Sequence, residues 1–108
     1  MNESQALRAL SALSDPTRLR IVRHLVKQGD AGATAGRIAD AVGASSSRSS
    51  FHLSALAQAG VLVSEKRSRH IFYRVDFPLL GDLMSFLIED CCGGHPVVRE
   101  CCQSGSKC

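Results

Sequence analysis

Apolar residues recur every three or four positions along most of the first 60 residues, a spacing that predicts amphipathic helices. Beyond Gly60 they gather in two β-rich runs on either side of the segment SEKRSRH, which predicts a hairpin. The run that follows is apolar nearly all round and predicts a last helix. Helices are therefore expected at 4–13, 16–28, 34–42, 45–60 and 77–90, and the hairpin strands at 61–63 and 71–75.

The ends of these segments carry residues that suit helix termini. Asp15 is the expected N-cap of the second helix, with Pro16 at the first helical position, and Thr34 is the expected N-cap of the third. Gly43 and Gly60 are expected to terminate the third and fourth helices. The first helix carries an apolar stripe of Ala6, Leu7, Leu10 and Leu13. The predicted inward faces of the next three helices consist of Leu19, Ile21, Val22, Leu25, Val26, Ile38, Ala39, Val42, Phe51, Leu53, Leu56 and Ala57.

Length and composition predict one soluble globular domain. The chain has 108 residues, of which 44% are hydrophobic and 21% charged, and its net charge of +3 permits an anionic partner. The N-terminus has no basic segment followed by an apolar run, so no signal peptide is expected. No apolar run approaches the roughly 18 residues of a membrane span. We therefore expect a cytoplasmic protein without a membrane partner.

Two short helices joined by a turn that contains Gly43 predict a helix-turn-helix. The second of them, at 45–60, begins with three serines that can each cap it, and it contains no acidic residue. Serine and arginine can bond phosphates or base edges, so this helix suits the groove of DNA. A solvated serine-rich helix start gives the same pattern. The outward positions hold Ser46, Ser47, Arg48, Ser50, Ser54 and Gln58.

The predicted hairpin has a basic tip. Lys66, Arg67, Arg69 and His70 are opposed only by Glu65. Such a tip can serve solubility alone, but directly after a helix-turn-helix it would reach the DNA backbone as a wing. The sequence therefore predicts a mainly α winged helix-turn-helix fold.

The last predicted helix, at 77–90, carries apolar residues on nearly every side. One small core cannot cover all of them. We therefore expect a homodimer that forms through the first and last helices. A fully buried last helix is the alternative.

All five cysteines lie within residues 91–108. A disulfide-stapled small fold spreads its cysteines along the chain, whereas a cluster at one end indicates a thiolate site. Gly93, Gly94 and Pro96 are expected to end the preceding helix. We therefore divide the chain into a DNA-binding and dimerisation domain at 1–90 and a flexible, cysteine-rich sensing tail at 91–108 without periodic structure.

Four segments resemble motifs of the ArsR/SmtB family of metal-responsive winged-helix repressors. Residues 13–21 (LSDPTRLRI) are similar to its L-x-D-P-T-R-L-x-I signature, and residues 50–56 (SFHLSAL) to its S-x-H-L-x-x-L. Residues 59–62 (AGVL) resemble the family's step into the wing, and residues 73–75 (YRV) its closing wing strand. The resemblance covers about residues 5–90.

The resemblance implies a repressor, not an enzyme, that binds double-stranded operator DNA as a homodimer and is released when a toxic ion binds. It implies that the start of the second helix of the helix-turn-helix enters the major groove and that the wing touches phosphates. It also places Phe51, Leu53 and Leu56 in the core. The predicted DNA contacts are Ser46, Ser47, Arg48, Ser50, His52, Lys66, Arg67 and Arg69.

The C-terminal cysteines resemble the arsenic-sensing variant of the family, with a vicinal pair and a third cysteine a short loop later. Two other family sites need a Cys-x-Cys before the recognition helix or histidines on the last helix, and residues 34–42 and 77–90 lack these. The resemblance implies As(III) or Sb(III) as inducer. The predicted ligands are Cys91, Cys92 and Cys101, with Cys102 as a substitute.

Other interpretations of the cysteines remain open. Soft ions such as zinc, cadmium or lead also bind thiolates, in a site that adds Cys102 as a fourth ligand, and His95 could ligate zinc. Thiol oxidation or persulfide is a third kind of signal. A thiol reductase or a metal buffer is a function of another class, although no Cys-x-x-Cys opens a helix and no phosphate-binding glycine loop is present.

Overall fold

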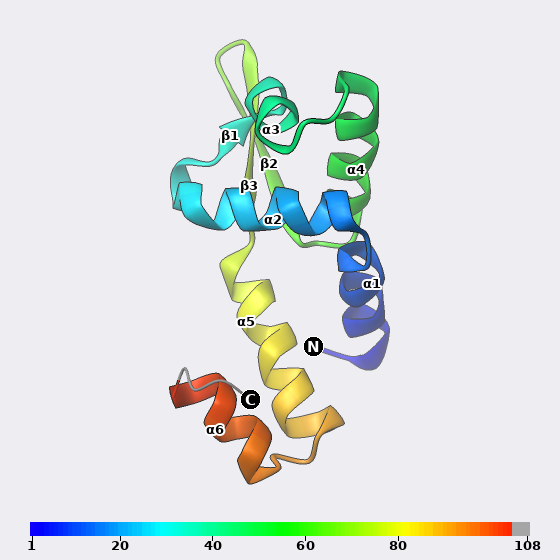
Figure 1. Ribbon diagram of the computed structural model, residues 1–108, viewed down its shortest axis with the longest axis vertical. Coiled ribbons are helices and arrows are strands. Elements are labelled where there is room, and N and C mark those ends of the chain that lie inside the picture. The colour runs from blue at the N-terminus through cyan, green and yellow to red at the C-terminus, as the bar shows by residue number, and fades with distance from the viewer. Residues whose placement is uncertain (105–108) are drawn as a thin grey trace.

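The computed structural model describes the backbone of residues 1–104 and the side chains of residues 1–101. It is a mainly helical winged helix-turn-helix, as predicted (Figure 1). None of the described helices is long and apolar enough to cross a membrane. The elements are α1 (Glu3–Leu13), α2 (Pro16–Gln28), the 3-10 turn η1 (Gly29–Ala31), β1 (Ala33–Thr34), α3 (Ala35–Val42), α4 (Ser46–Gln58), β2 (Leu62–Arg67), β3 (His70–Val75), α5 (Phe77–Ser85), the π-helical turn η2 (Phe86–Cys91) and α6 (Pro96–Ser104).

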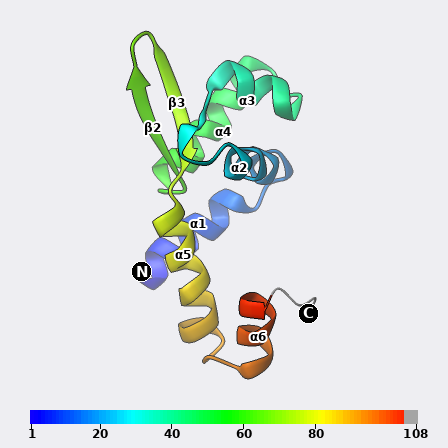
Figure 2. The same cartoon turned by 90° about the vertical axis from the view of Figure 1, so that its left-hand side faces the viewer.

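The molecule is elongated, with extents of 47 × 28 × 24 Å. Figures 1 and 2 show the β2–β3 wing and the α3–α4 pair near one end of the long axis, and η2 and α6 at the other. Helix α2 lies across the long axis between the two ends, and α5 runs from the base of the wing toward η2. The helix-turn-helix and the described cysteines therefore lie toward opposite ends of the long axis.

The predicted helix caps are confirmed. The Asp15 carboxylate accepts from the backbone N–H groups of Thr17 and Arg18, and Thr34 and Ser45 cap α3 and α4 in the same way. Gly43 ends α3 in the left-handed conformation at φ +68°. These local interactions fix where each helix of the helix-turn-helix begins, and so fix the turn between them.

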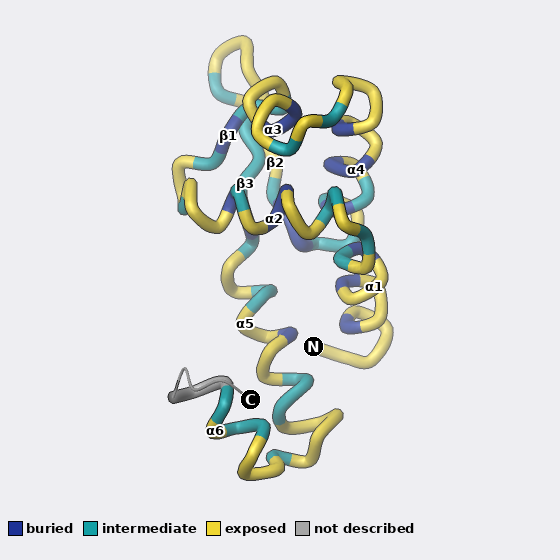
Figure 3. The backbone as a smooth tube through the Cα atoms, viewed as in Figure 1, coloured by how far each residue is buried: buried dark blue, intermediate teal, exposed yellow. Residues whose placement is uncertain are grey.

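The core lies where α2, α3 and α4 meet the base of the wing (Figure 3). Its largest fully buried side chains are Ile21, Leu25, Ile38, Leu53, Leu56, Val61, Val75 and Leu83. The predicted core faces were wrong at three positions, where the residue is exposed, namely Leu19, Val26 and Phe51. Leu7 and Leu10, on the predicted apolar stripe of the first helix, are exposed as well. Helix α1 instead packs through its alanines, Ala6, Ala9 and Ala12, which let its backbone come close to the core.

The C-terminal segment is more ordered than the prediction of a tail without periodic structure. The chain turns at Gly93 and Gly94 and then forms α6, with Pro96 at its first position. The His95 Nδ1 accepts from the Val97 backbone N–H at 3.2 Å and so serves the new helix start. Proline is favoured at a first helical position because its missing N–H has no helical partner there. Pro96 therefore starts a helix here as well as separating it from η2.

A short strand, β1, pairs with β3 and gives the sheet the order β1-β3-β2. Two residues are too few to show an alternating pattern, so the sequence did not predict this strand. The turn before it depends on Gly32, which lies at φ +66°. A Cβ atom on Gly32 would collide with the backbone carbonyl oxygen of Tyr73 on β3. Glycine at this position therefore allows β1 to approach β3.

We expect Gly32→Ala to destabilise the fold more than Gly29→Ala. Both glycines have nearly the same backbone conformation, at φ +62°, ψ −144° for Gly29 and φ +66°, ψ −163° for Gly32. Alanine should cost about 1–3 kcal/mol of strain at each position. Only Gly32→Ala adds the collision with Tyr73, since nothing lies within 4 Å of a Cβ on Gly29. Thermal unfolding of the two variants measures the difference, and equal losses would contradict the role given to Gly32.

Candidate nucleic-acid interface and thiol cluster

Helix α4 presents a polar outer face. Ser46, Ser47, Arg48 and Ser50 are exposed, and so are Ser54 and Gln58 further along the helix. The inner face consists of Ser49, His52, Leu53 and Leu56. The outer face therefore exposes hydroxyl, guanidinium and amide groups, at the positions that the sequence predicted to point outward.

His52 lies on the inner face and does not belong to this outer surface. Its residue is only 8% exposed, and its Nδ1 accepts from the Arg18 Nε at 3.0 Å. The spacing of His52 from Ser49 and Leu56, three and four residues away, places all three on one side of the helix. The prediction that His52 enters the major groove is wrong for this structure. His52 instead holds Arg18 against α4.

Phe51 was predicted in the core and is instead 66% exposed. Its ring packs edge to face against His52, with 5.6 Å between the ring centroids, and the Arg18 guanidinium lies 5.6 Å from the Phe51 centroid. Phe51 follows the buried Ser49 by two residues, which turns it to the opposite side of an α-helix. An exposed aromatic side chain therefore stands on the outer face among the serines.

Asp15 completes a junction between α2 and α4. Its Oδ1 accepts from the Thr17 N–H at 2.9 Å and from the Arg18 N–H at 3.1 Å. The hydrogen bond from the Arg18 backbone, with a smaller contribution from that of Thr17 and from the charge of Arg18, lowers the pKa of Asp15 below its ordinary 3.8 despite some desolvation. The Ser49 hydroxyl nearby in α4 is buried without a hydrogen-bond partner among the described residues. The polar contacts at this junction are thus concentrated on Asp15, Arg18 and His52.

The basic tip of the wing divides into outward and inward side chains. Lys66 and Arg69 are exposed. The Arg67 guanidinium instead donates to the Ala31 carbonyl oxygen at 3.1 Å and to Glu65 at 3.3 Å, and lies 4.7 Å from the centroid of the Phe72 ring. The hydrogen bond from Arg67 lowers the pKa of Glu65. Arg67 therefore ties the wing to η1, a role that its place in the basic run did not suggest.

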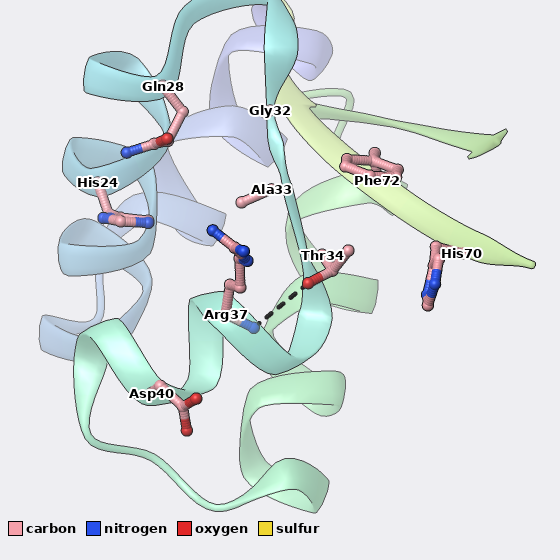
Figure 4. Close-up of a pocket in the computed structure, with 9 residues that line it drawn as sticks. All are labelled: His24, Gln28, Gly32, Ala33, Thr34, Arg37, Asp40, His70 and Phe72. Carbon is pink, nitrogen blue, oxygen red and sulfur yellow. Dashed lines mark hydrogen bonds between the residues drawn. The ribbon is translucent and has the colours of Figure 1, made fainter.

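A cleft of about 840 Å³ opens between α2, α3 and β3 (Figure 4). His24 and Gln28 line it from α2, Arg37 and Asp40 from α3, and His70 from β3. No group of three potential metal ligands gathers here or elsewhere in the described part of the chain. Pattern analysis gave no signal for this cleft, because its walls come from segments far apart in the sequence.

The described cysteines lie around the turn between η2 and α6. Cys91 ends η2 and Cys92 follows it, and neither takes part in a disulfide. Cys101 lies in α6 and is disulfide-bonded. The side chain of Cys102 and all of Cys108 lie outside the described residues. Within residues 1–101 the predicted ligands Cys91, Cys92 and Cys101 do not form a three-ligand cluster.

An ion pair connects the two segments on either side of the turn between η2 and α6. The Arg99 guanidinium of α6 lies 2.7 Å from the Glu89 carboxylate of η2. A Cβ on Gly94 would lie 2.7 Å from Arg99 Nη2 and 3.0 Å from a Glu89 oxygen, so glycine leaves room for the pair. The η2 and α6 segments that carry Cys91 and Cys101 are therefore held together across the turn.

Comparison with known proteins gives a family match and one curated relative. A helix-turn-helix domain model matches residues 13–65. The transcriptional repressor SdpR of Bacillus subtilis (strain 168) is 36% identical over 78 residues, which span 72% of this chain and 83% of that protein.

Solved structures of similar proteins cover between 71% and 97% of this chain. An ArsR-like transcriptional regulator from Rhodococcus sp. RHA1 aligns with a TM-score of 0.74 and 26% identity over 97% of this chain and 96% of that chain. A homodimeric winged helix-turn-helix DNA-binding domain of a possible ArsR-family regulator from Mycobacterium bovis aligns with a TM-score of 0.66 and 25% identity over 85% and 82%. A possible transcriptional regulator for arsenical resistance aligns with a TM-score of 0.62 and 33% identity over 71% and 77%.

We expect the stability of Asp15→Asn to depend less on pH in the acid range than that of the wild type. The folded-state pKa of Asp15 is depressed, so its contribution to stability is present above the unfolded value of 3.8 and is lost as the pH falls through the lower folded-state pKa. Asparagine keeps an accepting oxygen for the cap but does not titrate. The difference in Tm between wild type and variant should therefore shrink as the pH falls below 3.8.

Thermal unfolding at pH values from neutral to below the ordinary pKa of Asp15 measures this difference. Asp40→Asn, on the exposed surface of α3, is the matched control and should follow the wild type. A constant gap in Tm between wild type and Asp15→Asn across the acid range would contradict the expectation.

Proposed function

This chain belongs to the ArsR family of winged-helix transcriptional regulators, and we propose that it represses transcription as a DNA-bound homodimer that trivalent arsenic or antimony releases. The outer face of α4 is the observation that carries DNA binding. It exposes four serines or arginines in its first five residues and has no acidic residue, beside a wing with exposed Lys66 and Arg69. Serine hydroxyls and arginine suit base edges and phosphates, and basic wing residues suit phosphates.

The homodimer is supported by apolar side chains that the single chain leaves exposed. Leu7 and Leu10 lie outward on α1, and Phe77 and Met84 lie outward on α5. Of the residues in α5, only Leu83 is fully buried. A second copy that packs against α1 and α5 would remove these side chains from water, which is a favourable transfer for each. The pair of chains then presents two α4 helices to successive turns of one groove.

The thiols at the other end of the fold supply the inducer site. Trivalent arsenic and antimony are thiophilic and bind three sulfurs in a pyramid, and thiolates are the protein ligands that soft ions prefer. Adjacent Cys91 and Cys92 provide two of them, and Cys101 is the third, with Cys102 as its substitute. Cys101 must be a thiolate to bind, so a cellular thiol first reduces the disulfide that it forms in this structure.

Induction follows from the position of these thiols next to the dimer face. Gathering three sulfurs would draw α6 closer to η2, which continues α5. Movement of α5 then changes the separation of the two α4 helices, which must match half-sites about 34 Å apart. A coupling of only about 2.7 kcal/mol between ion and operator weakens DNA binding a hundredfold.

The disulfide at Cys101 supports a second candidate signal on the same scaffold. Forming or breaking the disulfide of Cys101 changes the covalent state of α6, which the Arg99–Glu89 ion pair joins to η2, so the same region can respond to oxidation. This candidate differs from the first in what releases the DNA. Arsenite acts on the reduced protein, whereas an oxidant acts on it without any ion.

We expect arsenite to release the reduced wild-type protein from the operator and to have little effect on Cys91→Ser. A gel shift with protein kept in a non-binding reductant measures the bound fraction as arsenite rises. Serine keeps the shape of cysteine but removes a thiolate, so the protein loses affinity for an ion that needs three sulfur ligands. The control is Ser104→Ala in the same C-terminal region, which should remain inducible. If wild-type DNA binding is insensitive to arsenite and antimonite, the inducer assignment is wrong.

We expect Lys66→Ala and Arg69→Ala each to lower the slope of log affinity against log salt by about 1, because each removes one phosphate contact. Both variants should weaken binding to all duplexes alike. Arg67→Ala should instead lower Tm, since its guanidinium is bound to Ala31 and Glu65. Salt titrations of duplex binding, together with thermal unfolding, separate the two effects. An unchanged slope in both Lys66→Ala and Arg69→Ala would remove the wing from the DNA contacts.

A further inference from the structure

The outer face of α4 contains one large apolar side chain, Phe51. Its residue is 66% exposed, whereas the other apolar residues of Ser46–Gln58 that are large, Leu53 and Leu56, are completely buried. Ser47 precedes Phe51 by four residues and Ser54 follows it by three, so both are its neighbours on the helix surface. Phe51 is therefore an isolated apolar group in a surface of hydroxyl groups.

The ring of Phe51 is held in place from the protein side. The Arg18 guanidinium lies 5.6 Å from the ring centroid, and Arg18 is itself fixed by its 3.0 Å hydrogen bond to His52. His52 also packs against the ring edge to face. Two neighbours therefore restrict the orientation of the exposed ring before any partner binds, so the Phe51 side chain loses less conformational entropy on binding.

A shallow hollow of about 410 Å³ adjoins the ring. Asp15, Ser47, Arg48, Phe51 and His52 line it. Phe51 forms an apolar wall, and Ser47 and Arg48 carry a hydroxyl group and a guanidinium group that can donate hydrogen bonds. Two acceptors also line the hollow and already have donors: the Asp15 Oδ1 accepts from the backbone of α2, and the His52 Nδ1 accepts from Arg18. The partner that fits such a hollow has a small apolar group directly beside hydrogen-bond acceptors.

We propose that Phe51 contacts the C5 methyl group of a thymine in the major groove. This proposal rests on the proposed insertion of α4 into DNA. Thymine is the one base whose major-groove edge carries a methyl group, and its O4 is a neighbouring acceptor. Phenylalanine contacts that methyl through apolar surface, while Ser47 or Arg48 can donate to an acceptor beside it. Phe51 is thus a specificity-determining residue of the reading helix.

A protein partner fits this surface less well. Protein docking sites on small domains are contiguous apolar patches, whereas Phe51 is surrounded on α4 by serines. The other large exposed apolar residues of the described chain belong to α1, α2, β3, α5, α6 and the N-terminus. The charge and hydroxyl content of the surroundings match a nucleic acid.

The test compares thymine with uracil, which lacks only the C5 methyl group. The wild-type protein first selects its preferred duplex from a random-sequence library. That duplex is resynthesised with deoxyuridine in place of thymine, at all positions and then at one position at a time. We expect wild-type affinity to fall about fourfold for each methyl that Phe51 contacts, the value for removing one methyl-sized apolar group from a contact. In a symmetric operator the loss should occur at equivalent positions of both half-sites.

The variants Phe51→Ala and Phe51→Leu assign the effect to this side chain. Phe51→Ala should bind the thymine and uracil duplexes equally, and Phe51→Leu should retain part of the discrimination because it keeps an apolar side chain. Val26→Ala, which shortens an exposed apolar residue on α2, is the matched control and should discriminate like the wild type. Because the measured quantity is the ratio of two affinities, a general loss of binding through Arg18 does not imitate the expected result.

Three outcomes would overturn the proposal. In the first, the wild type binds the thymine and uracil duplexes equally. In the second, Phe51→Ala keeps the wild-type ratio of the two affinities. In the third, Phe51→Ala binds both duplexes more weakly by the same factor and is still sensitive to uracil at the same position, as expected of a protein-docking or structural residue. Failure of the wild type to select any duplex would instead disprove DNA binding by α4, and with it the contact between Phe51 and the thymine methyl group. Selection without sensitivity to uracil would disprove the methyl contact alone.

Discussion

The hydrogen bond from Arg18 to His52 connects the start of α2 to the inner face of α4, and the orientation of the outer face of α4 depends on it. Asp15 fixes the first turn of α2 by capping it, so the Arg18 side chain leaves that helix at a defined place. Arg18 then meets both His52 and Phe51 on α4. The two family-like motifs, at 13–21 and 50–56, are thus the two sides of one contact. Their residues are required together because neither helix alone orients the outer face of α4.

The wing is attached to the same body by a comparable contact. Arg67 donates from the wing to the Ala31 carbonyl oxygen. Strand β1, which begins two residues after Ala31, pairs with β3. These contacts are close to the place where Gly32 permits the backbones to approach. Lys66 and Arg69 are left outward, so the wing combines an anchoring cation with free-standing ones. A run of basic residues on a hairpin can therefore contain members with opposite tasks.

The sequence predicted the elements of the winged fold well because their signals are local. Asp15, Thr34, Ser45 and Gly43 act on backbone groups within a few residues, and those signals do not depend on the rest of the fold. The inward faces were less predictable, since an apolar stripe does not say whether it meets the chain's own core or a second surface. Leu7 and Leu10 illustrate this, because they belong to an apolar stripe and are nevertheless exposed, while the alanines of α1 face the core.

The same limit explains the candidate sites. Phe51 and His52 exchanged their predicted places because their neighbours three and four residues away, not their hydropathy, decide which side of α4 they occupy. The contact of Arg67 with Ala31 spans 36 residues, and no short pattern contains it. Helix α6 did have a local signal in His95 and Pro96, which suit the residue before a helix and its first position, but a proline after two glycines equally suits the end of the preceding helix.

The π-helical turn η2 has a stereochemical consequence for the cysteines that end it. Its backbone bonds span five residues, as in the bond from the Cys92 N–H to the Leu87 carbonyl at 3.0 Å. Each residue added to a turn rotates everything after it by about 100° around the axis. The azimuth of the vicinal sulfurs is therefore set by a backbone insertion and not by their count from the start of α5. Two relatives with cysteines at equal distances along the chain can therefore direct the sulfurs to different sides of the helix axis, if only one of them contains the π-helical turn.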